Sequence, residues 1–406
     1  MPGAGGHVGK VDHAERKVQQ APAANIAELR RYNAAMESVE IAIIGAGPIG
    51  IELAVAFKRA GIDYIHLEAG QIGSTIHWYA PGTVFFSSPE RIAISGVPIV
   101  TPNQGKPTRE EYVNYLRGVV GQFQLPIRTY TRVTAIDRSA SGGFTLRLQR
   151  SYHGVGGPEL LEASRRLKPA AQDLAPVRTR KLVLAIGNLH HPRPCGIPGE
   201  DLPHVSHYFA DPHLYFGRRV LIVGGKNSAV EAAIRLVRVG CDVTLSYRRE
   251  WFNAKSVKYW LLPELEFFIK KGRMRFLPKT VPVEITVDGV RLAPADAEGR
   301  PVAGPTQEVP ADAVLLLLGY VQDQTLFEQA GIALEGERRI PKYDSGTMET
   351  SVPGVYVAGT AAAGIHEGRA LEFIETSHIH VDRIVAALTG RPPPTSERPD
   401  TSYLES

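Results

Sequence analysis

Two short glycine-rich segments constrain the fold of this 406-residue chain more than any other feature. Each segment follows an apolar, β-branched run and precedes a stretch typical of a helix; the two are Gly45-Ala46-Gly47-Pro48-Ile49-Gly50 and Gly224-Gly225-Lys226-Asn227-Ser228-Ala229. A strand, a glycine turn and a helix in this order bind a dinucleotide pyrophosphate at the N–H groups of the helix N-terminus. Two such units indicate two bound dinucleotides, the layout in which a nicotinamide passes a hydride to a flavin.

The first unit predicts a pocket for FAD or NAD. We expect a strand over 39–44, a helix over 49–59 and a second strand over 64–67 that ends at Glu68. An acidic residue about 20 positions after the first glycine accepts hydrogen bonds from ribose hydroxyls. The same carboxylate repels a 2′-phosphate, so this pocket does not suit NADP.

The second unit predicts a pocket for NADPH. Its third position is Lys226, where the usual pattern has glycine, and its second strand, over 243–247, ends at Arg248 and Arg249. Guanidinium groups bind phosphate through two parallel hydrogen bonds. Because one charge-assisted hydrogen bond contributes about 1.5–3 kcal/mol, we expect a preference for NADPH over NADH of about tenfold or more.

Composition restricts the class of protein. The chain is 43% hydrophobic and 22% charged, with a net charge of +4, which is ordinary for a globular protein of two domains and does not indicate nucleic-acid binding. The two cysteines, Cys195 and Cys241, are far apart, so a disulfide framework is excluded and a reducing cytoplasm is expected. The longest apolar runs are too short to span a membrane. No metal site is predicted.

We therefore predict an α/β fold with two Rossmann-like dinucleotide-binding domains, in which the NADPH domain is inserted into a two-piece FAD domain. Met36 stands directly before the first strand, so the preceding residues form either a tail or an extension upstream of the true start. The predicted segments are a flexible N-terminal extension over 1–37, FAD-domain parts over 38–190 and 321–392, the NADPH domain over 191–320 and a C-terminal tail over 393–406. A capping box at Thr108 opens one helix of the first part, and a long last helix runs from about His366 to Leu388.

These motifs resemble the two-dinucleotide flavoproteins that include thioredoxin reductase, and more closely the bacillithiol-disulfide reductase family. The resemblance covers about 36–390, nearly the whole chain. Its signatures are Phe85-Phe86-Ser87-Ser88, the second glycine segment with its Lys226, Trp260-Leu261-Leu262-Pro263, Gly319-Tyr320, and Val357-Ala358-Gly359 through Phe373-Ile374-Glu375.

Three departures from the related proteins matter. No Cys-x-x-Cys pair precedes the second segment, which excludes the dithiol relay of thioredoxin reductases. The disulfide-reductase family often carries a cysteine within its first glycine segment, where this chain has Ile49. The flavin-ribityl aspartate of the superfamily is replaced by Thr360.

Motifs and resemblance together imply a set of cofactor-binding residues. His77 belongs to a segment that the resemblance places beside the flavin ring, where aromatic neighbours shield it from water. The expected set is Gly45, Ala46, Gly47, Pro48, Ile49, Gly50, Glu68, His77, Val133, Ala185, Gly187, Gly224, Lys226, Asn227, Ser228, Arg248, Arg249, Gly359 and Thr360.

Catalytic residues are harder to assign, because hydride transfer from NADPH to FAD needs no protein nucleophile. Lys258 and Trp260 are candidates for lining a substrate cleft, and His366 stands where the last helix is expected to point at the flavin. Cys195 is a candidate redox thiol, since the neighbouring Arg193 would lower its pKa. For Cys195 and Cys241 alike, an incidental packing role is the competing interpretation.

The predicted activity is that of an NADPH-dependent FAD oxidoreductase. It passes electrons to a low-molecular-weight disulfide such as bacillithiol disulfide. The resemblance implies a homo-oligomer, and the cysteine content indicates the cytoplasm. Two alternatives stay open: a flavin monooxygenase that uses NADPH and O₂, and a non-enzymatic flavoprotein that senses redox state.

Overall fold

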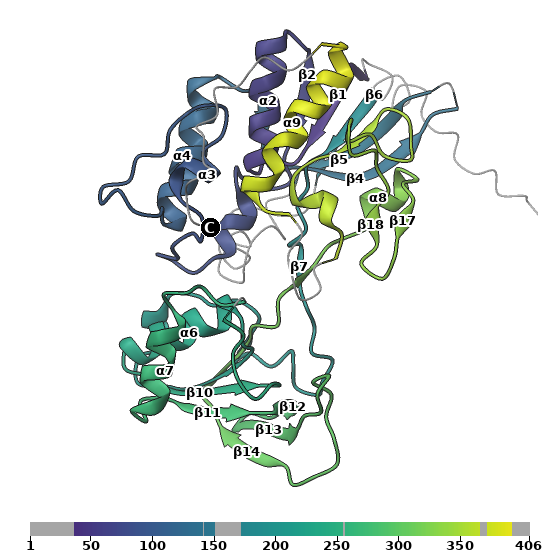
Figure 1. Cartoon of the computed structure of the whole chain (residues 1–406). Helices are drawn as coiled ribbons and strands as arrows, with labels where there is room; N and C mark the ends of the chain where they lie inside the picture. Colours follow the sequence, from purple (N-terminus) through teal and green to yellow (C-terminus); the bar gives the residue numbers. More distant parts are fainter. Residues whose placement is uncertain (1–35, 141, 151–171, 255, 366–371, 392–406) are drawn as a thin grey trace, which may run out of the picture. The chain divides into compact units, whose positions relative to one another are not determined.

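The computed structural model describes residues 36–140, 142–150, 172–254, 256–365 and 372–391 (Figure 1). The N-terminal extension predicted over 1–37 and the tail predicted over 393–406 lie almost wholly outside the described residues. None of the described helices combines the length and apolar character that crossing a bilayer requires.

The first sheet has seven strands in the order β3-β2-β1-β6-β5-β4, with β19 paired to β6. β1 pairs in parallel with β2 and β6, and its last four residues are buried. Apolar residues on both faces are typical of a parallel strand covered on both sides. The strands are β1 (Glu37–Ile44), β2 (Tyr64–Leu67), β3 (Ile127–Arg128), β4 (Thr131–Arg138), β5 (Phe144–Arg150), β6 (Gln172–Leu184) and β19 (Val355–Val357).

Helices α2 and α9 pack against each other beside this sheet (Figure 1). The predicted capping box is confirmed: Thr108 accepts a hydrogen bond from the Glu111 backbone, and α4 starts at Arg109. The helices in the same part of the chain as the first sheet are α2 (Pro48–Ala60), α3 (Pro89–Ile92), α4 (Arg109–Gln122), α8 (Thr325–Gln329) and α9 (Ile374–Thr389). The 3₁₀ turns there are η1 (Ser74–Trp78) and η3 (Gly359–Ala363).

The last helix begins later than the sequence pattern predicts. The described helix α9 starts at Ile374, and the two residues before it are not helical. His366, at the predicted start, lies outside the described residues.

The second sheet is parallel, with the order β11-β10-β9-β15-β8. Beside it stands an antiparallel sheet in the order β12-β13-β14. Their elements are β8 (Val205–Ser206), η2 (Pro212–Tyr215), β9 (Arg219–Val223), α6 (Asn227–Arg238), β10 (Asp242–Tyr247), α7 (Leu262–Lys270), β11 (Arg275–Pro278), β12 (Thr280–Ile285), β13 (Gly289–Pro294), β14 (Gln307–Pro310) and β15 (Ala313–Leu316).

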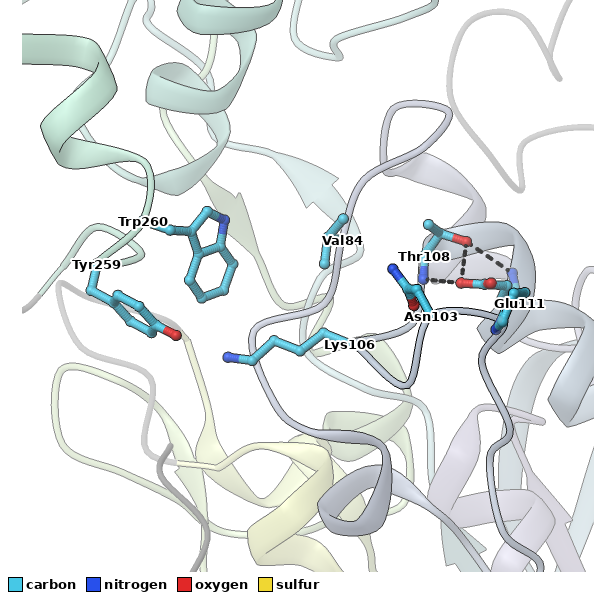
Figure 2. Close-up of a pocket in the computed structure, with 8 residues that line it drawn as sticks. Val84, Asn103, Lys106, Thr108, Glu111, Tyr259 and Trp260 are labelled. Carbon is cyan, nitrogen blue, oxygen red and sulfur yellow. Dashed lines mark hydrogen bonds between the residues drawn. The ribbon is translucent and has the colours of Figure 1, made fainter. Parts of the chain in front are cut away.

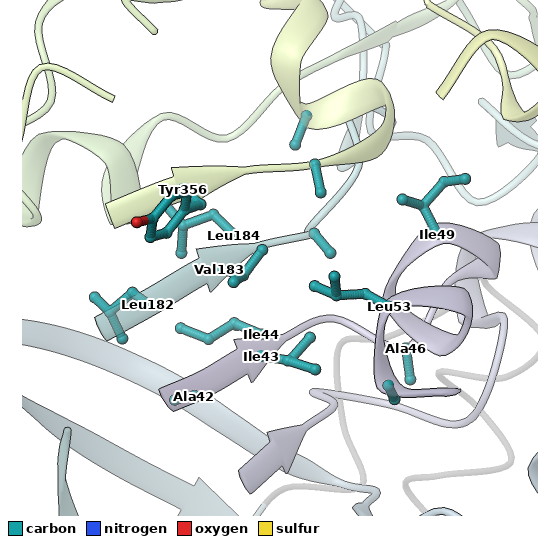
Figure 3. Packing of buried hydrophobic residues seen from close by; sticks show 14 of the residues in the cluster. Ala42, Ile43, Ile44, Ala46, Ile49, Leu53, Leu182, Val183, Leu184 and Tyr356 are labelled. Carbon is teal, nitrogen blue, oxygen red and sulfur yellow. The ribbon is translucent and has the colours of Figure 1, made fainter. Parts of the chain in front are cut away.

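Each of the two parallel sheets has its own hydrophobic core. The first core joins β1, β6 and β19 to α2 and contains Ile43, Leu53 and Leu184, all fully buried (Figure 3). The second core packs α6 and α7 on one face of the second sheet, and a third cluster fills the space between that sheet's other face and the antiparallel sheet. Separate cores are the mark of separate folding units.

Two chain segments connect the sheets. The outgoing strand β7 (His191–Pro192) pairs antiparallel with the returning strand β16 (Tyr320–Val321), and a small hairpin of β17 (Leu334–Glu335) and β18 (Ile340–Pro341) follows. Because β19 returns to the first sheet after the second sheet is complete, the predicted insertion of one Rossmann-like domain into another is confirmed. The boundaries at 190 and 320 remain predictions.

Candidate cofactor sites

The three turns that follow parallel strands of the first sheet gather at one edge. β1, β6 and β19 are mutually parallel, with Ile44 and Val357 both in register with Leu184. Their following turns, over 45–50, 185–187 and 358–363, therefore lie together at the carboxyl edge. In open α/β sheets this edge is where a ligand binds.

The first glycine turn is closely packed on its strand side and open on the other. Gly45 has φ +105°, and a Cβ on it would lie 2.4 Å from the carbonyl oxygen of Ala185. A Cβ on Gly50 would lie 2.0 Å from the carbonyl oxygen of Gly45. A Cβ on Gly47 would meet nothing within 4 Å. The turn thus has the open face that a pyrophosphate needs for close approach.

The N-terminus of α2 has the character of an anion site. Gly47 is its N-cap and makes no side-chain capping bond, Pro48 occupies the first turn, and that turn carries no acidic residue. The first N–H groups of a helix have no intrahelical partner, so they are available to a phosphate. A dinucleotide pyrophosphate fits this cradle.

Glu68 lies next to the turn, as the spacing predicts. It is buried, and its carboxylate accepts hydrogen bonds from the N–H groups of Ala46 at 2.6 Å and Gly70 at 2.7 Å and from Ser74 Oγ at 3.1 Å. Burial raises the pKa of Glu68, and these hydrogen bonds oppose the rise. A carboxylate has about four acceptor positions, so about one is left for a ribose hydroxyl.

The remaining residues predicted to bind FAD divide between this edge and the core. A Cβ on Gly359 would lie 3.3 Å from Ile49 Cβ, and one on Gly187 would lie 3.7 Å from Thr360 Oγ1. These residues therefore line neighbouring turns. Val133 instead lies in β4, buried in the first core.

Buried polar atoms in η1 are consistent with a ligand contact. His77 Nε2 and Trp78 Nε1 are buried and make no hydrogen bond within the described part of the chain. Buried polar groups normally have a partner. Burial also lowers the pKa of His77, with Arg109 and Arg117 adding to the effect, so the ring is neutral near pH 7. This is the segment that the resemblance places beside the flavin ring.

The second glycine turn explains why lysine stands in a glycine position. Gly224 has φ +147°, and a Cβ on it would lie 2.6 Å from the carbonyl oxygen of Leu317. The Tyr247 ring covers Gly225, where a Cβ would lie 2.3 Å from a ring carbon. Lys226, the N-cap of α6, has an extended backbone with φ −114°. Extended backbone accepts any side chain, so Lys226 is not a defect of the motif.

The other two predicted residues of this turn begin the helix. Asn227 and Ser228 are the first residues of α6, whose first turn carries no acidic residue. Asn227 Oδ1 accepts a hydrogen bond from the backbone N–H of Lys258 at 2.7 Å. The Asn227 side chain therefore fixes a neighbouring loop, while the backbone N–H groups remain oriented for phosphate.

Positive charges converge beside this turn. Burial lowers the pKa of Lys226, and the nearby charges of Arg248, Arg193 and Arg249 lower it further. Arg248 packs across Gly299, where a Cβ would lie 2.3 Å from Arg248 Cδ. Like charges gathered in this way repel one another unless an anion joins them. The sequence analysis considered Arg193 only as a neighbour of Cys195. Its approach to Lys226 depends on the path of the chain after β7, which the sequence does not show.

Trp260 lines a pocket of about 470 Å³, and Lys258 precedes it by two positions without lining the pocket (Figure 2). Lys258 is buried, and its Nζ donates to Glu231 Oε2 at 3.1 Å and to the Val84 carbonyl at 2.8 Å. Trp260 lines the pocket, and Lys106 Nζ lies 4.4 Å from the centre of its ring. These two bonds hold the Lys258 ammonium group in place, and Trp260, which lines the pocket, is the better candidate for contact with a substrate. The pocket is lined by Val84, Pro102, Asn103, Lys106, Thr108, Glu111, Tyr259 and Trp260.

Cys241 lies in the second cluster and Cys195 packs against the third, so neither is at the first glycine turn. Burial, together with the charge of Glu200, raises the pKa of Cys195 to about 11, so the predicted lowering by Arg193 is wrong. Cys241 is buried, and its Sγ donates to the Tyr215 carbonyl at 3.1 Å. Neither thiol is activated as a nucleophile. No metal-binding group of three or more His, Cys, Asp or Glu side chains occurs among the residues the structure describes.

Comparison with known proteins agrees with this geometry. The family model described as pyridine nucleotide-disulphide oxidoreductase matches residues 42–152 and 171–359. The chain is 31% identical to bacilliredoxin reductase Bdr of Bacillus subtilis over 349 residues, which cover 86% of this chain and 97% of the relative.

Two solved structures are also similar. Bacillithiol disulfide reductase Bdr from Bacillus cereus is 29% identical, with a TM-score of 0.76, over 87% of this chain and all of the other. A flavin-containing monooxygenase from Stenotrophomonas maltophilia has 19% identity and a TM-score of 0.60 over 87% of this chain and all of its own, so it shares the fold alone.

Proteins of this family use FAD and NADPH, and the two cradles fit them. FAD supplies a ring that takes a hydride from NADPH and releases two electrons to an acceptor. The glycine turns at the two helix N-termini would hold the pyrophosphates, and Glu68 and the cations beside Lys226 would distinguish the two nucleotides. The chain belongs to the pyridine nucleotide-disulphide oxidoreductase family and, within it, to the bacillithiol-disulfide reductases, as an NADPH-dependent FAD oxidoreductase.

Proposed function

We propose that this enzyme reduces a low-molecular-weight disulfide, such as bacillithiol disulfide, without a cysteine of its own. The overall reaction is NADPH + H⁺ + RSSR → NADP⁺ + 2 RSH. Two electrons pass through FAD, the S–S bond breaks, and the departing thiolates take up the protons.

The placement of the two cysteines is the observation that carries this proposal. The first glycine turn carries Ile49, whose side chain packs against the Gly359 turn. Cys195 is half-buried against the third core cluster and has a raised pKa, and Cys241 is buried in the second. A relay through protein thiols would need a thiolate at the flavin-binding edge.

We also propose which residues bind each cofactor. The turns over 45–50, 185–187 and 358–363, with Glu68 and His77, are assigned to FAD. The N-terminus of α6, with Lys226, Arg248 and Arg249, is assigned to NADPH. The assignments rest on the closely packed glycines, the uncapped helix N-termini and the converging cations described above.

The decisive experiment removes both thiols. The double variant Cys195→Ser/Cys241→Ala is reduced anaerobically with NADPH and then mixed with bacillithiol disulfide in a stopped-flow instrument. We expect flavin reoxidation within about twofold of the unmodified enzyme and two thiols formed per NADPH consumed. Unchanged reduction by NADPH combined with lost reoxidation would show that a protein thiol takes part.

The acceptor panel extends the same measurement. The similar protein from Bacillus subtilis is named for bacilliredoxin, so an oxidised bacilliredoxin joins bacillithiol disulfide and oxidised glutathione. If only oxidised bacilliredoxin reoxidises the flavin quickly, the acceptor is that protein and not a low-molecular-weight disulfide. Oxygen uptake coupled to a hydroxylated product would favour the monooxygenase alternative, and slow turnover with every acceptor would favour the sensor.

We further propose that the enzyme works in the cytoplasm as a homo-oligomer. Both cysteines are free, as expected in a reducing compartment. Light scattering of the purified protein measures the oligomeric state directly.

A further inference from the structure

A single buried side chain connects three segments of the FAD domain that are far apart in sequence. Gln322 is 4% exposed, and its Nε2 donates to the carbonyls of Gly187 at 3.0 Å and Ala361 at 3.1 Å. Its Oε1 accepts from Gln324 Nε2 at 2.8 Å. Both N–H groups and the oxygen of the amide are therefore used.

The two carbonyls belong to the turns assigned to the flavin. Gly187 ends the turn after β6, and Ala361 lies in η3 after β19. The two turns are in contact, since a Cβ on Gly187 would lie 3.7 Å from Thr360 Oγ1. Gln322 holds their backbones together from the side of the returning chain.

Gln322 also directly follows the returning strand β16, which pairs with β7. His190 strengthens this junction with three hydrogen bonds. Its backbone N–H donates to the Val321 carbonyl at 3.1 Å, and its Nε2 donates to the Ile186 carbonyl at 2.9 Å. Its Nδ1 accepts from the Asp323 N–H at 2.9 Å. An imidazole that accepts at one nitrogen and donates at the other is neutral. Both chain crossings are thus bonded to the turn after β6.

We propose that Gln322, supported by His190, is a positioning residue that ties the crossing strands to the two flavin-lining turns. Its amide sets the spacing between the Gly187 and Ala361 backbones and thereby the contact of this edge with FAD. The proposal depends on FAD binding at this edge, not on the identity of the acceptor.

The test uses the full-length FAD-loaded enzyme with Gln322→Glu. This change keeps the side-chain shape and places an oxygen against two carbonyl oxygens. We expect the FAD dissociation constant, measured by flavin fluorescence titration, to rise at least tenfold, which corresponds to about 1.4 kcal/mol. The visible flavin spectrum and midpoint potential should shift as well, because the two turns assigned to FAD move apart.

Gln122→Glu is the matched control, since Gln122 is exposed at the end of α4. It should leave the dissociation constant, spectrum and potential unchanged. If Gln322→Glu does not fold, Gln324→Leu removes the bond to Gln322 Oε1 and leaves the two carbonyl contacts in place. We then expect a rise of about twofold to fivefold and a spectral shift in the same direction.

The proposal is overturned if the folded Gln322→Glu protein binds FAD like the unmodified chain with an unchanged spectrum and potential. It is equally overturned if Gln122→Glu changes these quantities as much, or if Gln324→Leu, used in its place, changes none of them. The titration of the unmodified chain separates a failure of this role from a failure of FAD to bind.

Discussion

Replacing Arg248 and Arg249 by alanine separates recognition of the 2′-phosphate from every other part of nucleotide binding. Both side chains are exposed and follow β10, beside Lys226 at the N-terminus of α6. Because NADH lacks the 2′-phosphate and is otherwise identical, it serves as an internal control for the same protein.

The size of the effect follows from the charged hydrogen bonds that are lost. One such bond contributes about 1.5–3 kcal/mol, and about 1.4 kcal/mol corresponds to tenfold in affinity. At an exposed site the lower value applies because solvent screens the charges. We therefore expect about a tenfold loss of NADPH affinity for Arg248→Ala and about a hundredfold loss for the double variant, since Lys226 and Arg193 remain.

The assay is anaerobic stopped-flow reduction of the flavin over a range of NADPH and NADH concentrations. The NADPH dissociation constant should rise while the rate constant at saturation stays the same, and NADH binding should change by less than about twofold. Added salt should weaken NADPH binding in the unmodified enzyme more than in the double variant. Equal losses for NADPH and NADH would refute the assignment, because the arginines would then act on the fold or the shared part of the nucleotide.

Three further predictions concern stability. Gly45→Ala should lower the free energy of unfolding by more than the ~1–3 kcal/mol of backbone strain and abolish FAD retention, because its Cβ would also clash with a backbone oxygen. Gly61→Ala is also at positive φ but has open space around it, so it should lower the free energy of unfolding by the backbone strain alone. Glu52→Leu removes the 2.6 Å partner of the buried His378 Nδ1 and should cost about 3 kcal/mol in chemical denaturation; a loss below about 1 kcal/mol would contradict a buried pair. Burial lowers the pKa of His380 from 6.5 to about 4. Between these two pH values the unfolded chain binds more protons than the folded chain. The free energy of unfolding should therefore fall by up to about 1.4 kcal/mol for each pH unit that the pH is lowered. His380→Gln should flatten this dependence, and an unchanged slope in urea titrations across pH 4–7 would show that other groups cause it.

Residues whose role depends on local chain geometry were predictable from the sequence. Position 45 has φ +105°, and any side chain there would place its Cβ 2.4 Å from a backbone oxygen. Only glycine fits, so this position can be recognised from the six-residue motif alone. Glu68 was found by its distance along the chain, because one βαβ unit has a nearly fixed length. The exact contacts of these residues, such as the hydrogen bond from the Ala46 N–H to Glu68, were not predictable from the sequence.

Residues whose role depends on distant partners were missed or misjudged. Cys195 has a basic neighbour in sequence, but in the fold burial and Glu200 govern its pKa. The bonds of the Lys258 ammonium group to the Val84 carbonyl and to Glu231, 174 and 27 positions away, were not predictable from the sequence. Gln322 has no sequence signal, because its two carbonyl partners lie 135 and 39 positions away.

The sequence by itself determined the two glycine-turn units and their order along the chain, because glycine turns and strand periodicity are local properties. Only the tertiary structure decided which side chains meet at the edge of the first sheet. That edge is assembled from β1, β6 and β19, and it is held to the returning strand by Gln322. Contacts between segments that far apart depend on how the sheets close and pack, and residue order alone does not contain that distance information.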